Sequence, residues 1–218
     1  MEELYTTWKA IGVAGGDLSF FQDFFVKFYQ AFIEGDRWLQ YLNGVKTTLL
    51  VTALALILGI VLGVLVAMLR TAHDQQRPGH RNPILAVLNL ICKVYVTVIR
   101  GTPMMVQLLI MGFVIFASSR NFTMIGTLTL GINSGAYVSE IVRGGLMSVD
   151  KGQMEAGRSL GLNYMTTMRF IVIPQAVKAI LPALGNEFII LLKDTSLITV
   201  IGGKELLYAA QGIYNRTY

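Results

Sequence analysis

The chain has 218 residues, of which 54% are hydrophobic and only 14% are charged. Its mean hydropathy is +0.58, and its apolar runs reach the length of a membrane span, a combination that soluble domains rarely tolerate. These values exclude an ordinary soluble protein and predict an all-α integral membrane protein. A single cysteine, Cys92, excludes an internal disulfide.

Residues 1–42 are polar and aromatic, and we predict that they form an external or interfacial N-terminal segment. Five phenylalanines recur there at helical spacing, with charged and amide residues between them: Phe21, Phe24, Phe25, Phe28 and Phe32. This pattern is typical of an amphipathic helix that lies in the headgroup region of a bilayer. Trp38 and Tyr41 follow as an aromatic anchor at the start of the first span.

Residues 43–218 are predicted to form a transmembrane domain with four spans. The first span contains Gly59-x-x-x-Gly63, a spacing that permits close contact between helices. The apolar stretch 84–118 is broken at Arg100-Gly101-Thr102-Pro103, and we expect a tilted or interfacial first part followed by a span. The predicted spans cover about residues 44–69, 104–117, 124–146 and 181–201.

The loop after the first span is basic, with Arg70, Arg77 and Arg81. Because arginine and lysine gather in cytoplasmic loops, we place this loop inside the cell and both chain termini outside. His73 and His80 also lie in the loop, seven residues apart, without a further cysteine or histidine nearby. No metal site is therefore predicted.

Residues 154–175 form a polar, glycine-containing segment between apolar ones. Asp150 can cap a helix that begins at Lys151 and ends at about Leu160, where Gly161 supplies a positive φ. Asn163 can cap a second helix, which we expect to end where Pro174 interrupts its hydrogen bonding. Two short helices that meet at a glycine make a compact unit able to press into a partner's groove. The alternative is a helix pair that only anchors a span.

The spacing of this segment resembles a known pattern. Glu155-Ala156-Gly157, then Gly161, then Ile171-x-Ile173-Pro174 match the cytoplasmic loop of bacterial ABC importer permeases, E-A-A-x3-G-x9-I-x-L-P, in register. Gly157 stands for the second alanine and Ile173 for the leucine. The resemblance implies a coupling loop, about residues 148–175, that docks a cytoplasmic ATPase. Its implied coupling residues are Glu155, Ala156, Gly157, Arg158, Ser159, Leu160 and Gly161.

Three further motifs resemble the polar amino-acid branch of these permeases. They are Arg100-Gly101-Thr102-Pro103, Ala136-Tyr137-x-x-Glu140-x-x-Arg143-Gly144-Gly145, and Leu184-Gly185-Asn186-Glu187-Phe188 through Lys193-Asp194-Thr195-Ser196-Leu197. The implied fold is a type I importer helical bundle, in which Arg100, Pro103, Arg143, Pro174 and Glu187 have structural or gating roles. That family has a fifth span, which this chain lacks before its end at Tyr218, and this departure suggests a shortened chain.

The resemblance also implies partners and a location. Such permeases form homodimers or heterodimers in the bacterial cytoplasmic membrane, each bound to an ATP-binding subunit. An external substrate-binding protein delivers the polar amino acid. ATP and Mg belong to the partner ATPase, so this chain is expected to need no cofactor of its own and to be no enzyme.

Charged residues inside spans are costly and usually functional, at about 2.5–3.5 kcal/mol on insertion scales. Glu140 and Arg143 lie three residues apart and can pair, and Lys193 and Asp194 interrupt the last span. Such pairs either hold helices together or line a midplane site for a zwitterion. In the second interpretation Glu140 and Asp194 face the ammonium group. The predicted substrate path is Asn133, Ser134, Tyr137, Glu140, Lys193 and Asp194.

Enzymatic patterns do not fit. Gly157-Arg158-Ser159-Leu160-Gly161 matches G-x-S-x-G, but both histidines precede Ser159, whereas that motif needs a histidine base after it. Gly203-Lys204 is followed by Glu205, so no Walker loop is completed. We therefore predict a subunit of an ATP-driven amino-acid importer. The alternatives are a stand-alone channel or facilitator without an ATPase, and a scaffold subunit of a larger membrane complex.

Overall fold

The computed structural model describes residues 1–76 and 82–217, and these residues form helices and connecting turns without a strand. The predicted all-α class is thus confirmed for the described chain. Arg77, His80 and Arg81 of the predicted basic loop lie outside the described residues. Contacts divide the chain into two units, Met1–Thr48 with Lys204–Tyr218, and Leu49–Gly203. The predicted division at residue 42 differs from this one, because the end of the chain groups with its beginning.

The first unit contains α1 (Glu2–Val13), α2 (Phe20–Phe28), the beginning of α3 (Arg37–Asp74) and α10 (Leu206–Thr217). Ser19 and Gln22 form a reciprocal capping box that starts α2 where the phenylalanine spacing predicts a helix. A π turn, Tyr29–Ile33, and a 3-10 turn, Glu34–Asp36, lead to α3. The chain bends there because Gly35 and Asp36 both have a positive φ, 63° and 55°.

The phenylalanines of α2 continue an aromatic row into α3. Phe24 stacks on Phe28 with ring centroids 6.3 Å apart, Phe28 on Phe32 at 5.0 Å, and Phe32 on Tyr41 at 5.1 Å. Phe21 is 81% exposed and Phe24 61% exposed. The predicted helix therefore exists and presents an aromatic face, as an interfacial helix requires.

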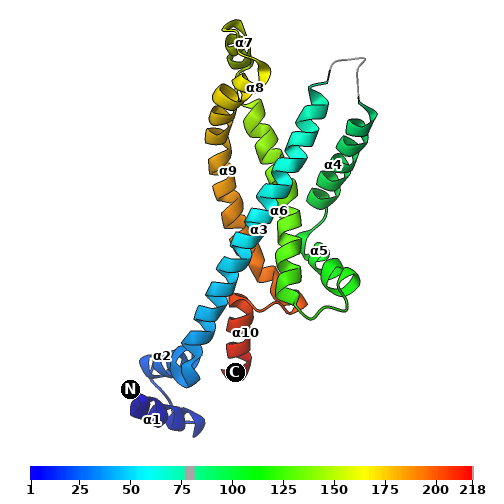
Figure 1. Ribbon diagram of the computed structural model, residues 1–218. Helices are drawn as coiled ribbons and strands as arrows, with labels where there is room; N and C mark the ends of the chain where they lie inside the picture. Colours follow the sequence, from blue (N-terminus) through cyan, green and yellow to red (C-terminus); the bar gives the residue numbers. More distant parts are fainter. Residues whose placement is uncertain (77–81, 218) are drawn as a thin grey trace. The chain divides into compact units, whose positions relative to one another are not determined.

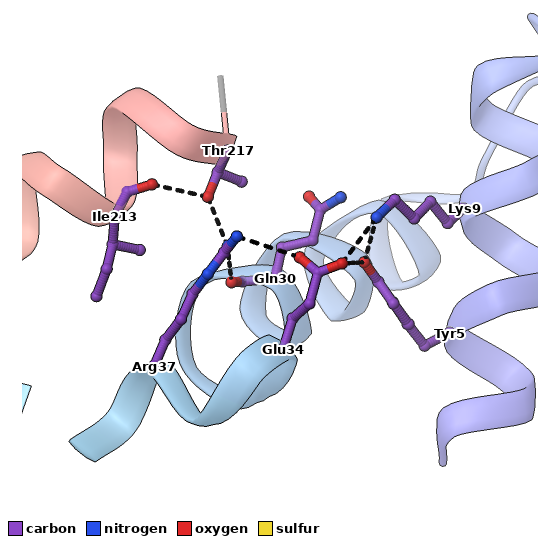
Figure 2. A network of polar contacts seen from close by, with 7 residues as sticks. All are labelled: Tyr5, Lys9, Gln30, Glu34, Arg37, Ile213 and Thr217. Carbon is purple, nitrogen blue, oxygen red and sulfur yellow. Dashed lines mark hydrogen bonds and ion pairs between the residues drawn. The ribbon is translucent and has the colours of Figure 1, made fainter. Parts of the chain in front are cut away.

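Glu34 joins the N-terminal helices to each other (Figure 2). Its carboxylate accepts hydrogen bonds from the Tyr5 hydroxyl at 2.8 Å and from Lys9 Nζ at 2.9 Å, both on α1. An Arg37 nitrogen lies 3.4 Å from the same carboxylate. The Tyr5 hydroxyl, and then the Glu34 carboxylate, raise the pKa of Lys9 above its ordinary value of 10.5 because both stabilise the charged amine.

Arg37 extends this polar network to the end of the chain (Figure 2). Its guanidinium donates to the Gln30 carbonyl and, at 2.7 Å, to the Thr217 hydroxyl on α10. Thr217 in turn donates to the Ile213 carbonyl at 2.9 Å. Arg37 thus joins the turns that precede α3 to α10, 180 residues further along the chain, which explains why α10 belongs to the N-terminal unit.

The second unit is built around α6 (Phe122–Met147), which packs against α4 (Pro83–Gly101), α5 (Met104–Ile110) and α9 (Ile173–Asp194). Figure 1 shows α6 between α4 and α9. A π turn, Met111–Ile115, follows α5, and a 3-10 turn, Thr195–Ile201, follows α9. Buried residues occur along α6 from Ile125 to Gly145, so this helix forms the core.

The glycine pair of α3 lies against α6, as its spacing predicts. A Cβ built on Gly59 would lie 2.6 Å from Ser134 Oγ, and one built on Gly63 would lie 2.6 Å from Val138 Cβ. No side chain larger than hydrogen fits at either position without moving its neighbour. The Gly59-x-x-x-Gly63 prediction of a close helix contact is confirmed.

Three helical stretches of the described chain are long and apolar enough to span a membrane: Phe20–Asp74, Pro83–Gly101 and Tyr164–Ile201. The prediction for residues 84–118 is wrong in its order, because the stretch of spanning length comes first and the apolar helix Met104–Ile115 is shorter. The predicted span at 124–146 corresponds to α6, which is 26 residues long but does not qualify by composition. The lower hydropathy of α6 fits its central position, because neighbouring helices rather than lipid cover much of it.

Candidate functional site

The predicted coupling loop has the capped helices that its sequence indicates. α7 (Lys151–Ser159) begins at Asp150, whose carboxylate accepts a hydrogen bond from Gly152 N at 2.6 Å. Gly161 has φ of 82° and ends this turn. Asn163 then caps α8 (Tyr164–Thr167) by accepting from Thr166 N at 2.8 Å. Both helices lie at one end of α9 (Figure 1).

The second helix does not end at Pro174, contrary to the prediction. α8 continues through a π turn, Met168–Val172, directly into α9. Pro174 lies in the first turn of α9, directly after the π turn, and the helix runs on through it. The loop is consequently joined to α9 by continuous helix.

Most of the predicted coupling residues are on the surface of the loop. Glu155, Ala156, Arg158, Ser159, Leu160 and Gly161 are exposed, and Gly157 is buried. Leu160 is 80% exposed and Met165 on α8 is 70% exposed. The loop thus offers charged and apolar side chains together to a partner.

Side-chain hydrogen bonds hold the loop on two helices of its own unit. The Tyr164 hydroxyl donates to Gln75 Oε1 beyond the end of α3 at 2.6 Å. Gln175 Nε2 on α9 donates to Gln153 Oε1 on α7 at 3.1 Å. The loop is therefore attached laterally as well as through the backbone.

A cavity of about 420 Å³ lies between the break after α4, the middle of α6 and the end of α9. It contains six of the predicted site residues: Arg100, Pro103, Asn133, Tyr137, Glu187 and Asp194. The Arg100 guanidinium lies over the Tyr137 ring at 5.2 Å from its centroid. One guanidinium and two carboxyl groups thus line a single space, which suits a ligand that carries both signs of charge.

Buried polar contacts fix the walls of this cavity. Ser134, fully buried, donates to Glu187 Oε1 at 2.7 Å and so joins α6 to α9. Asn133 Nδ2 donates to Gln107 Oε1 at 3.1 Å. Gln107 Nε2 donates to the Thr102 hydroxyl at 2.8 Å, which holds the chain break in place. Sequence reasoning missed Gln107, although it is the only polar residue in the apolar run of α5.

Five of the predicted substrate-path and structural residues do not line the cavity: Ser134, Glu140, Arg143, Pro174 and Lys193. The predicted pairing of Glu140 with Arg143 is wrong, because each pairs with α3 instead. Glu140 accepts a hydrogen bond from Arg70, and Arg143 lies 3.5 Å from Asp74. Lys193 is exposed. Among residues 1–76 and 82–217, no three His, Cys, Asp or Glu side chains are grouped to hold a metal ion.

Comparisons with known proteins agree with this arrangement. Residues 84–218 match the family described as binding-protein-dependent transport system inner membrane component. The chain is 36% identical over 180 residues to a Rickettsia prowazekii protein assigned as a glutamine transport system permease, covering 81% of this chain and 78% of the relative. It is 42% identical over 134 residues to the Escherichia coli glutamine transport system permease protein GlnP, covering 58% of this chain and 60% of the relative. A crystal structure of an amino acid ABC transporter with histidines superposes with a TM-score of 0.72 at 40% identity, covering 82% of this chain and 79% of that one.

Proposed function

Since the chain belongs to the family of binding-protein-dependent transport system inner membrane components, we propose that it carries out the membrane step of ATP-driven amino-acid uptake. It is the permease subunit of an amino-acid ABC importer. ATP is bound with Mg and hydrolysed by a separate cytoplasmic subunit, and an external binding protein delivers the substrate. Two permease subunits, identical or different, form the pathway in the bacterial cytoplasmic membrane.

The observation that carries this proposal is the coupling loop. Its exposed residues Glu155, Arg158 and Ser159 lie on α7 at one end of α9, and α9 contributes Glu187 and Asp194 to the cavity at the other. Helix connects the loop to the cavity without a break in the chain, through the π turn Met168–Val172 and past Pro182 inside α9. ATP-driven closure of the partner subunits would move the loop, and α9 would transmit that motion to the pathway.

The cavity is the proposed substrate path. Arg100 faces the substrate carboxylate, and Asp194 faces its ammonium group, supported by hydrogen bonds from Asn133 and Tyr137. Glu140 is not proposed for the ammonium group, because Arg70 already engages its carboxylate. The names of the relatives mention glutamine and that of the solved structure mentions histidines, so a polar amino acid is the proposed substrate class.

The test uses the permease reconstituted into liposomes with its ATPase subunit and binding protein. Glu155→Lys reverses the charge on the exposed face of α7. Gly161→Pro demands φ near −65° where the chain has 82°, and removes the N–H that donates to the Arg158 carbonyl. Both variants are expected to insert normally and to lose ATP-dependent uptake. Gly144→Ala serves as the control, because nothing lies within 4 Å of the added Cβ.

Normal ATP-dependent uptake by both variants would exclude the coupling assignment. The channel alternative predicts a different result. Amino-acid flux through vesicles that hold this chain alone, without ATP, would favour a stand-alone facilitator.

A further inference from the structure

The coupling loop pattern has two alanines. Ala156 occupies the first position, and Gly157, the buried residue of α7, stands at the second. A Cβ built on it would lie 2.5 Å from Thr167 Cγ2 and 2.9 Å from Thr167 Oγ1. Distances below 3.0 Å are not tolerated by a real Cβ. Ile171 Cδ1 would lie 3.2 Å away, so the space that an alanine would need is filled mainly by Thr167 and bounded by Ile171.

Thr167 cannot easily turn away from this contact. Its side chain has no exposed surface, and its hydroxyl donates to the Asn163 carbonyl one turn earlier at 3.0 Å. β-Branched side chains have few χ1 rotamers in a helix, and this hydrogen bond selects one of them. The orientation of the methyl group toward Gly157 is thus fixed by the helix itself.

The Gly157–Thr167 contact lies where α7 packs on the helix that continues into α9. Thr167 is the last residue of α8, directly before the π turn Met168–Val172 that continues into α9. Gly157 lies in the last turn of α7, between Glu155 and the exposed Leu160. The remaining side-chain bond between α7 and α9, from Gln175 to Gln153, is exposed and can exchange with water. The Gly157–Thr167 contact is the buried one.

We propose that Thr167 is a positioning residue for coupling, and that Gly157 and Thr167 are matched in size so that displacement of α7 is passed to α9. This inference rests on the proposed function of the coupling loop, and adds that a buried size-matched pair holds α7 on the helix that leads to the cavity. Neither residue needs to touch the ATPase. Their role is to keep α7 seated on the helix that leads to the cavity.

The test is a double-mutant cycle in the reconstituted importer, with its ATPase subunit and binding protein. Gly157→Ala, Thr167→Ala and the double variant are compared for amino-acid uptake, ATP hydrolysis and co-purification of the ATPase. The ratio of substrate transported to ATP hydrolysed is the readout, because a variant that only folds less well changes both rates together. Thr166→Ala, one position away on α8, is the matched control.

Gly157→Ala is expected to lower the transport-to-hydrolysis ratio about tenfold while the ATPase remains bound, because overpacking displaces α7. The double variant is expected to recover to within about twofold of the unmodified protein, because removal of the Thr167 methyl and hydroxyl opens the space for alanine. Thr167→Ala alone leaves a gap, and a loss of about twofold to threefold is expected.

An unchanged ratio in Gly157→Ala, or a double variant no better than Gly157→Ala, would overturn the inference. The proposed function would survive this result if Glu155→Lys and Gly161→Pro still abolished uptake. Full uptake in all of these variants would instead overturn both, since the loop would then not couple at all.

Discussion

Replacing Arg37 by methionine is expected to loosen the N-terminal unit, because this side chain joins three parts of it. Arg37 is 14% exposed and donates to the Gln30 carbonyl and to the Thr217 hydroxyl, whereas methionine keeps the apolar stem without a donor. A polar group left without its partner costs about 1–3 kcal/mol. The ion pair with Glu34 adds little, since that carboxylate is about a third exposed and is screened by water.

This loss of free energy raises the equilibrium constant for local opening of the N-terminal unit by about fivefold to 150-fold. Hydrogen exchange with mass spectrometry on the detergent-solubilised protein should show this as reduced protection of amides in α1, α2 and α10. Lys27→Met is the control, because the Lys27–Asp23 pair is exposed on both sides and such pairs contribute about 0.3–0.5 kcal/mol. Equal protection in the Arg37 and Lys27 variants would refute the assignment of Arg37 as the junction.

Two further predictions concern packing and pH. Gly145→Ala would overlap Ile180 where α6 meets α9, so a loss of about 1–3 kcal/mol and a lower Tm in detergent are expected, whereas Gly144→Ala, in open space, should leave the Tm unchanged. The raised pKa of Lys9 means that its contribution to stability is complete below pH 10.5 and is lost as the pH rises through the higher folded value. The Tm in detergent should therefore fall more steeply above pH 10.5 in the unmodified protein than in a Lys9→Met variant, and equal falls would contradict this.

The parts of the fold that were predicted correctly depend on neighbours in the chain. Asp150, Gly161 and Asn163 act through hydrogen bonds or φ values within three residues, so their caps follow from local chemistry. The Gly59-x-x-x-Gly63 contact follows from spacing on one helix face. The sequence does not show which residues these glycines face. Only the folded chain identifies them as Ser134 and Val138.

The incorrect predictions concern partners distant in sequence. Glu140 lies three residues from Arg143, and local spacing favours their pairing, but Arg70 is 70 residues away and lies closer in the fold. Pro174 reads as a helix end, yet the preceding π turn places it in the first turn of α9. Its missing N–H interrupts a regular α-helical ladder, but here the five residues before α9 adopt π geometry and the chain stays helical.

The charged residues within the spans divide between the two interpretations that the sequence leaves open. A charge in a membrane helix must be paired or must face a cavity. Glu140 is paired with Arg70 and joins α6 to α3, whereas Arg100 and Asp194 line the cavity. Glu187 does both, since it lines the cavity and accepts the Ser134 hydrogen bond. The Arg70–Glu140 pair holds two helices together, and the charges that line the cavity are those that we propose meet a zwitterionic substrate.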